Sequence, residues 1–204
     1  TSPLLYIFGK RYTGDVQLKK PWLLYQIIKL LKTTEFLVRG AGRIPCPCCS
    51  KKMRVIGTRD RKSKQSSGEV KVYNIRRLRC DHCMRIHHEL PDVLVPYKRY
   101  DSESIEKVLS NPSNHDVAAD ESTLFRWMEW FDFFLEYWIS CLISIIHHTK
   151  QENIPLKDSS LISKTALQKI GRLVGNAPRW LVRIVRPIVN NNCWIHTRSA
   201  CLSV

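Results

Sequence analysis

The chain has 204 residues, enough for one medium-sized domain or two to three small modules. Its 33 lysines and arginines against 18 aspartates and glutamates give a formal net charge of +15, which indicates an anionic partner such as nucleic acid or an acidic membrane surface. Apolar residues make up 44% of the sequence and six residues are tryptophan, so the composition excludes a disordered basic tail and predicts a folded protein.

The first segment, residues 1–43, holds one predicted amphipathic helix. Pro21 suits a first helical turn, and apolar residues follow it at helical spacing. They are Leu23, Leu24, Ile27, Ile28 and Leu31. We therefore predict a helix from Pro21 to Thr33 that packs on a neighbouring element, an interpretation we favour over membrane binding.

Two close-set cysteine pairs mark the next segment, residues 44–95, as a zinc ribbon. A Cys-x-x-Cys turn supplies two thiolates, and two such turns complete a tetrahedral metal site. The two-residue spacing selects Cys46, Cys49, Cys80 and Cys83 as the ligands of one structural Zn²⁺. Cys48 is then expected to face away from the metal.

Other uses of these cysteines are less consistent with the sequence. Disulfides need an oxidising compartment, and the N-terminus shows no secretory leader, so we expect a cytoplasmic protein. A redox pair would lie beside a βαβ pattern, which is absent. Iron bound by the same four thiolates stays open as an alternative. We place the nearby His82, His87 and His88 outside the metal's ligand set.

The residues between and after the cysteine pairs predict three short antiparallel strands. Met53 to Thr58 and Val70 to Leu78 are rich in β-branched and apolar residues, and the basic run Arg59 to Gly68 between them reads as a hairpin loop. A third strand is expected from Arg85 to Leu90. Metal binding contributes about 10–16 kcal/mol in small zinc peptides, so we expect this segment to be disordered without metal.

A mostly helical region, residues 96–150, follows, which makes the predicted fold class α+β. Asp101 suits the N-cap of a first helix, His115 to Ala119 form at most a brief second one, and Asp120 caps a long third helix. The order is typical of a helix-turn-helix. In that case Arg126 would read guanine, and the hydroxyl groups of Ser122 and Thr123 would hold phosphate.

Two further stretches complete the chain. Phe131 to Ile146 is strongly apolar but contains Asp132 and Glu136, so we favour a buried helix or a homodimer seam over a membrane span. The segment 151–204 predicts two basic helices, Leu161 to Val174 and Pro178 to Val189. Their charge suits phosphate contacts or anionic lipid.

Several motifs resemble the N-terminal half of bacterial insertion-sequence transposases, and more closely short stand-alone proteins of Gram-positive bacteria. The motifs are the two cysteine runs 46–49 and 76–83, His87-His88-Glu89-Leu90-Pro91-Asp92, Pro96-Tyr97-Lys98-Arg99-Tyr100 and Ser122-Thr123-Leu124-Phe125-Arg126-Trp127. The resemblance covers about Ile44 to Trp130, with a weaker likeness in the tail. In these transposases the zinc ribbon and the helix-turn-helix bind the ends of the element.

The resemblance implies a DNA-binding protein of a mobile element, such as a transposition accessory factor, a transposase remnant or a regulator. The transposases continue into a domain with three acidic residues that hold two metal ions for strand transfer. No carboxylate follows Asp158 here, so the resemblance implies DNA binding without strand cleavage. No catalytic triad order or phosphate-binding glycine loop is visible either, and we expect no enzyme.

The expected partner is duplex DNA, with a transposase or recombinase as a further expectation. The expected DNA contacts are Lys51, Lys52, Arg54, Arg76, Arg77, Arg79, Ser122, Thr123 and Arg126. Two alternatives remain open. The chain could be an adaptor that docks the ribbon or the apolar helix on another protein, or it could bind RNA in place of DNA.

Overall fold

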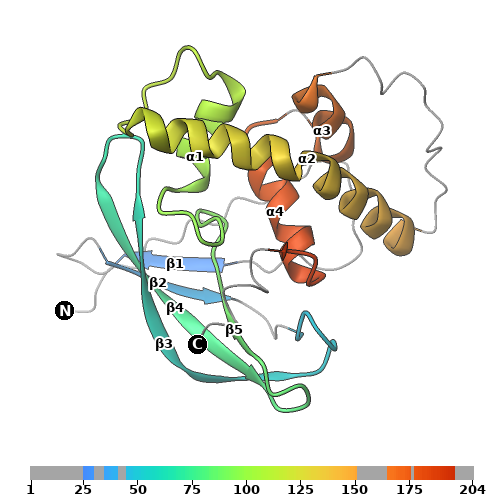
Figure 1. Cartoon of the computed structure of the whole chain (residues 1–204). Coiled ribbons are helices and arrows are strands. Elements are labelled where there is room, and N and C mark those ends of the chain that lie inside the picture. The colour runs from blue at the N-terminus through green and yellow to red at the C-terminus, as the bar shows by residue number, and fades with distance from the viewer. Residues whose placement is uncertain (1–24, 30–34, 41–44, 151–164, 176, 196–204) are drawn as a thin grey trace.

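The computed structural model describes residues 25–29, 35–40, 45–150, 165–175 and 177–195. They form a five-stranded mixed sheet and four helices, an α+β fold as predicted (Figure 1). The strands are β1 (Tyr25–Lys29), β2 (Glu35–Gly40), β3 (Met53–Lys64), β4 (Val70–Cys80) and β5 (Ile86–His88). The helices are α1 (Ser102–Ser110), α2 (Glu121–Lys150), α3 (Ala166–Val174) and α4 (Trp180–Asn190).

The predicted ribbon is present as β3, β4 and β5, which pair antiparallel. One edge of β4 pairs with β3 along its length, while the other edge pairs with β2 in parallel and then with β5. The predicted loop from Arg59 to Gly68 is wrong, because β3 continues to Lys64 and the turn begins only at Gln65. Most charged residues of this run are exposed on the edge strand, where polar side chains are favoured, while Arg61 is half-buried and donates to the carbonyl of Lys98 at 2.8 Å.

The predicted helix from Pro21 to Thr33 is also wrong where the structure describes it. Tyr25–Lys29 is a strand whose Ile27 pairs with Val38 of β2. Val38 is fully buried in a small core with Tyr73, Ile75 and Leu94. Pairing with a buried neighbouring strand outweighs the helical spacing of the apolar residues, because propensity is weaker than tertiary context.

The β3–β4 turn lies against the segment that precedes α2 (Figure 1). The backbone N–H of Ala118 donates to the carbonyl of Ser66 at 2.7 Å, and the Tyr100 hydroxyl donates to the Ala118 carbonyl at 3.1 Å. Both backbone groups of Ala118 are therefore used in these loop contacts. The brief helix predicted from His115 to Ala119 is absent, and an irregular connection joins α1 to α2.

Both predicted helix caps are confirmed. The Asp101 carboxylate accepts from the backbone N–H of Ser104 at 2.8 Å, and the Asp120 carboxylate accepts from that of Thr123 at 2.7 Å. Asp101 is nearly buried, at 5% exposure. We expect Asp101→Ala to destabilise the protein by about 1–2 kcal/mol, the usual cost of losing an N-cap. Chemical denaturation measures this, and Asp101→Asn, which keeps the cap, should cost much less.

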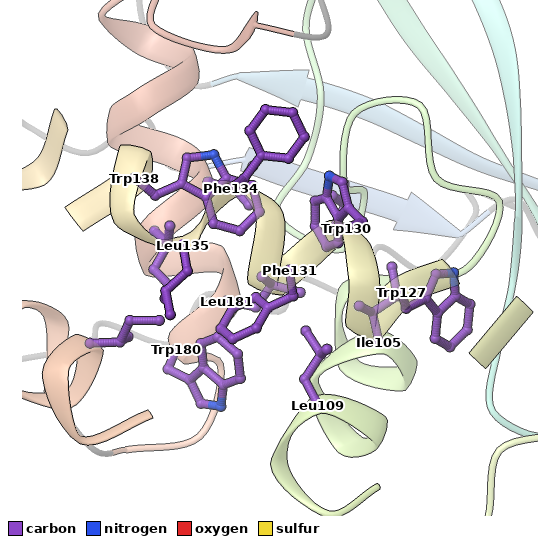
Figure 2. Packing of buried hydrophobic residues seen from close by; sticks show 14 of the residues in the cluster. Ile105, Leu109, Trp127, Trp130, Phe131, Phe134, Leu135, Trp138, Trp180 and Leu181 are labelled. Carbon is purple, nitrogen blue, oxygen red and sulfur yellow. The ribbon is translucent and has the colours of Figure 1, made fainter. Parts of the chain in front are cut away.

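The helices share a large aromatic core (Figure 2). Trp130, Phe131 and Trp138 of α2 share one buried cluster with residues of α1 and α4, and the rings of Phe131 and Trp180 lie 5.5 Å apart. The predicted buried helix is thus observed in the apolar run from Phe131 to Ile146. A homodimer through this run stays a prediction. By length and composition alone, Glu121–His148 could also cross a membrane, but core helices meet the same criteria.

The two tail helices belong to this same core. The apolar face of α4 is buried between the other helices. The sequence alone is equally consistent with contact between this face and lipid. Glu106 of α1 accepts hydrogen bonds from the backbone N–H groups of Arg179 and Leu181, at 2.6 and 2.9 Å, and so caps the start of α4. The predicted first helix of the tail begins at Leu161, which lies outside the described residues; α3 is described from Ala166.

Candidate metal centre and basic ribbon

The two cysteine turns have the same backbone geometry. In the first, the N–H of Cys46 donates to the carbonyl of Lys51 at 2.8 Å, and in the second the N–H of Cys80 donates to that of Arg85 at 3.0 Å. The residue after each second cysteine, Ser50 or Met84, has φ of 58°. Each turn therefore folds back on itself and directs two thiols toward the same side.

The four predicted ligands come together. The sulfur atoms of Cys46, Cys49, Cys80 and Cys83 all lie within 4.8 Å of one another. The Cys46–Cys83 and Cys49–Cys80 sulfur distances are 3.6 and 3.5 Å, too long for a disulfide bond. A tetrahedral zinc with Zn–S bonds of about 2.3 Å separates its sulfurs by about 3.8 Å. The residues present therefore fit a tetrahedral metal ion.

The thiols differ in their acidity. Backbone N–H groups of Cys83 and His82 donate to the sulfur of Cys80 and lower its pKa to about 6. Burial instead raises the pKa of Cys46 to about 12. Four thiolates this close repel each other unless a cation joins them. Metal binding must therefore displace protons, and the metal affinity should fall as the pH is lowered.

Cys48 and His87, which are outside the predicted ligand set, lie beside the four-cysteine group. The Nε2 atom of His87 is 3.5 Å from the sulfur of Cys46 and 3.9 Å from that of Cys48. Cys48 also accepts a hydrogen bond from Arg85 at 3.3 Å. The expectation that Cys48 faces away is thus wrong. The pairing of β5 with β4, which sets His87 opposite Leu78, brings the imidazole to the centre.

The predicted DNA contacts on the ribbon fall into different environments. Lys51 and Lys52 are exposed next to the first cysteine turn. Arg54 is exposed and pairs with Asp81 at 2.8 Å. Arg76 pairs through two nitrogens with the carboxylate of Glu89, whose side chain is fully buried. Arg77 and Arg79 are half-buried on β4.

The predicted contacts on α2 are at the other end of the ribbon. The hydroxyl groups of Ser122 and Thr123 both donate to the Asp120 carboxylate, at 2.6 and 3.0 Å. Arg126 is exposed, and so are Glu121 and Glu129 on the same helix. The 12 residues of β3 span on the order of 35 Å at about 3.3 Å per residue. The structure thus separates the start of α2 from the metal centre.

The segment from Lys51 to Cys80, which forms β3 and β4, carries more than half of the chain's net positive charge. Between Lys51 and Cys80 there are eleven lysines and arginines but two carboxylates, a net +9 of the chain's +15. The exposed ones on β3 include Arg59, Lys62 and Lys64. Because successive side chains of a strand point to opposite faces, Lys62 and Lys64 lie on one face of β3 and Arg59 lies on the other.

A comparison with protein families finds one that matches part of this chain. It is described as a domain of unknown function, DUF6431, and its match covers residues 46–127. That segment contains the four cysteines of the metal centre, the ribbon, α1 and the first turns of α2. No curated protein and no solved structure matches the chain. The similarity therefore relates residues 46–127 to a family of domains, and it assigns this segment no function.

Proposed function

We propose that this protein is a non-catalytic, zinc-containing protein that binds duplex DNA through the basic ribbon. The observation that carries the proposal is the concentration of charge: a net +9 lies between Lys51 and Cys80, and six of the eleven cationic side chains there are exposed, on β3 or just before it. Lysine and arginine side chains that neutralise phosphates release condensed counterions, which drives binding to DNA of any sequence.

The metal would have a structural role in this function. Zinc held by Cys46, Cys49, Cys80 and Cys83 would join the start of β3 to the end of β4. These ends are adjacent, because Met53 pairs with Cys80. Lys51, Lys52 and Arg54 would then have defined positions beside the metal. The all-thiolate donor set favours zinc over hard cations such as Mg²⁺.

The predicted DNA contacts on α2 would contribute less to binding than those on the ribbon. Ser122 and Thr123 already donate to Asp120, and acidic residues flank Arg126, so phosphate would be repelled from much of this helix face. Arg126 remains the residue of α2 that would reach a base. Because β3, which is on the order of 35 Å long, lies between the start of α2 and the cysteine turns, simultaneous contact at both ends would cover about one turn of DNA.

A role in a mobile element is the biological setting we propose. It is supported by the resemblance of the cysteine turns and of the start of α2 to the N-terminal half of insertion-sequence transposases. The matched segment 46–127 spans the same parts of the chain. An accessory factor, a remnant of a transposase and a regulator of the element would all use DNA binding of this kind.

Removing charge from the ribbon tests the proposal. The triple variant Lys51→Gln, Lys52→Gln, Lys62→Gln should bind a fluorescent duplex more weakly at low salt. Its plot of log K against log salt concentration should flatten by about 0.9 for each lysine–phosphate pair that the substitutions remove. The matched control is Lys107→Gln with Arg172→Gln, on α1 and α3, which should behave like the wild type.

The edge position of β3 provides another explanation for its lysines. The same variants distinguish this explanation from DNA binding. Charged side chains on an edge strand prevent pairing with other chains. If that were their only role, the triple variant would aggregate more but would bind DNA with unchanged affinity and salt dependence. That outcome would overturn the ribbon's proposed role in DNA binding.

A protein-interaction adaptor is the second candidate function. It is favoured by two aromatic side chains on the outer face of α2, Phe125 and Phe133, which are 57% and 79% exposed. Exposed aromatic residues often anchor protein interfaces. Phe125→Ser with Phe133→Ser should leave DNA affinity unchanged under the first function, and should abolish capture of a transposase or recombinase partner under the second.

A further inference from the structure

The metal centre has more donor atoms than one tetrahedral ion requires. Besides the four-cysteine group, Cys46, Cys48, Cys83 and His87 also place their donor atoms within 4.8 Å of one another. The two groups share Cys46 and Cys83. Cys48 and His87 come from different parts of the fold, the first cysteine turn and β5, and they meet only because β5 pairs with β4.

We propose that the centre binds two divalent metal ions, with the thiolates of Cys46 and Cys83 as bridges. One ion would be held by these two with Cys49 and Cys80. The second would be held by the same two with Cys48 and His87. Two tetrahedral ions that share two ligands need six donors, which is the number that the two groups supply together.

The distances agree with this arrangement. The sulfur atoms of Cys46 and Cys83 are 3.6 Å apart, close to the edge of about 3.8 Å in a tetrahedron with Zn–S bonds of about 2.3 Å. On the second side of this edge, the Nε2 atom of His87 lies 3.5 Å from the Cys46 sulfur and 3.9 Å from the Cys48 sulfur. Sulfur and imidazole nitrogen are both ordinary zinc ligands.

The charges also favour the second ion. One divalent ion bound by four thiolates leaves a net charge of −2, and a fifth thiolate at Cys48 would increase the repulsion. A second divalent ion reduces the total for five thiolates and a neutral imidazole to −1. The guanidinium of Arg85 donates to the sulfur of Cys48 at 3.3 Å and would compensate this remaining charge. Each thiol would release its proton to solvent on binding.

Metal counting in the 204-residue chain tests the proposal. The protein is stripped of metal under reducing, oxygen-free conditions and reloaded with ¹¹³Cd²⁺, which replaces zinc at thiolate sites and gives an NMR signal for each bound ion. We expect two equivalents per chain and two signals, one from an ion with four sulfur ligands and one from an ion with three sulfurs and one nitrogen. One equivalent and one signal in the wild type would overturn the proposal.

Single variants show where the second ion lies. His87→Ala and Cys48→Ser should each lose one equivalent and one signal while the four-cysteine group keeps the other. His88→Ala is the matched control, because His88 is the adjacent exposed residue on β5, and it should keep two. Two equivalents in both His87→Ala and Cys48→Ser would place the second ion elsewhere and refute this site. The NMR readout involves no DNA, so its result is independent of the proposed DNA-binding function.

Discussion

Replacing Cys46 with serine is expected to abolish metal binding and to unfold the metal-bearing end of the ribbon. Cys46 is 1% exposed and belongs to both groups of candidate ligands, so among the described residues neither group keeps four donors without it. Metal binding contributes about 10–16 kcal/mol of folding free energy in small zinc peptides. The loss should therefore be large at this end of the protein.

The structure limits how far this unfolding should extend. The sequence alone predicts that the whole segment 44–95 is disordered without metal. However, the half of the ribbon distant from the metal, next to the β3–β4 turn, has other contacts. It pairs with β2 and shares a core with Val38 and Leu94, and its turn accepts a hydrogen bond from Ala118. We expect the amides near both cysteine turns to exchange rapidly, while those of the distant half and the helices stay protected.

Hydrogen exchange followed by mass spectrometry measures this, together with zinc analysis. Cys141→Ser is the matched control, because this half-buried cysteine packs against the helical core. It should keep the metal and the wild-type exchange at both turns. Retention of the full metal content by Cys46→Ser, with unchanged exchange, would contradict the assignment of the centre.

Arg76→Ala is expected to cost about 3–5 kcal/mol of stability, the usual effect of removing one partner of a buried ion pair. The side chain of Glu89 is fully buried, and two nitrogens of Arg76 bond to its carboxylate. Gly40 packs directly against this ion pair, since a Cβ atom at that position would meet the Glu89 carboxylate. Without the guanidinium, the buried carboxylate of Glu89 would lose both of its charge-assisted hydrogen bonds.

The control for this prediction is Arg54→Ala on the same ribbon. Arg54 pairs with Asp81, but the side chains are 57% and 65% exposed, and exposed pairs contribute at most about 1 kcal/mol. Denaturant unfolding compares the two variants. An equal, small loss in both would mean that the Arg76–Glu89 pair does not stabilise the fold, and Arg76 would then be as available for DNA as the sequence suggests.

Local signals in the sequence were sufficient for the helix caps and the four cysteines. An N-cap acts within its own first turn, and a Cys-x-x-Cys spacing determines two ligands at once, so Asp101, Asp120 and the cysteine group could be predicted. The same spacing rule conceals Cys48, because it selects the first and last cysteine of the run. His87 reaches the centre through strand pairing, which its neighbours in sequence do not reveal.

Non-local contacts account for the elements that were predicted incorrectly. Tyr25–Lys29 has a helical pattern of apolar residues, but it becomes a strand because β2 offers it a partner. Residues 115–119 form neither helix nor strand, and the ribbon turn accepts a hydrogen bond from the backbone N–H of Ala118 there. Along β4, the buried positions change from Tyr73 and Ile75 to Leu78 and Cys80, opposite an irregularity between Val55 and Gly57 of β3. A bulge of this kind bends the strand that contains it and increases the local twist.

The salt dependence of duplex binding by the zinc-loaded protein tests the central claim most directly. Fluorescence anisotropy at a series of salt concentrations should show binding at low salt. It should also show a linear fall of log K with log salt, with a slope of about −0.9 for each phosphate contact on the basic ribbon. Absence of binding at low salt with zinc present, or binding that does not change with salt, would contradict the account.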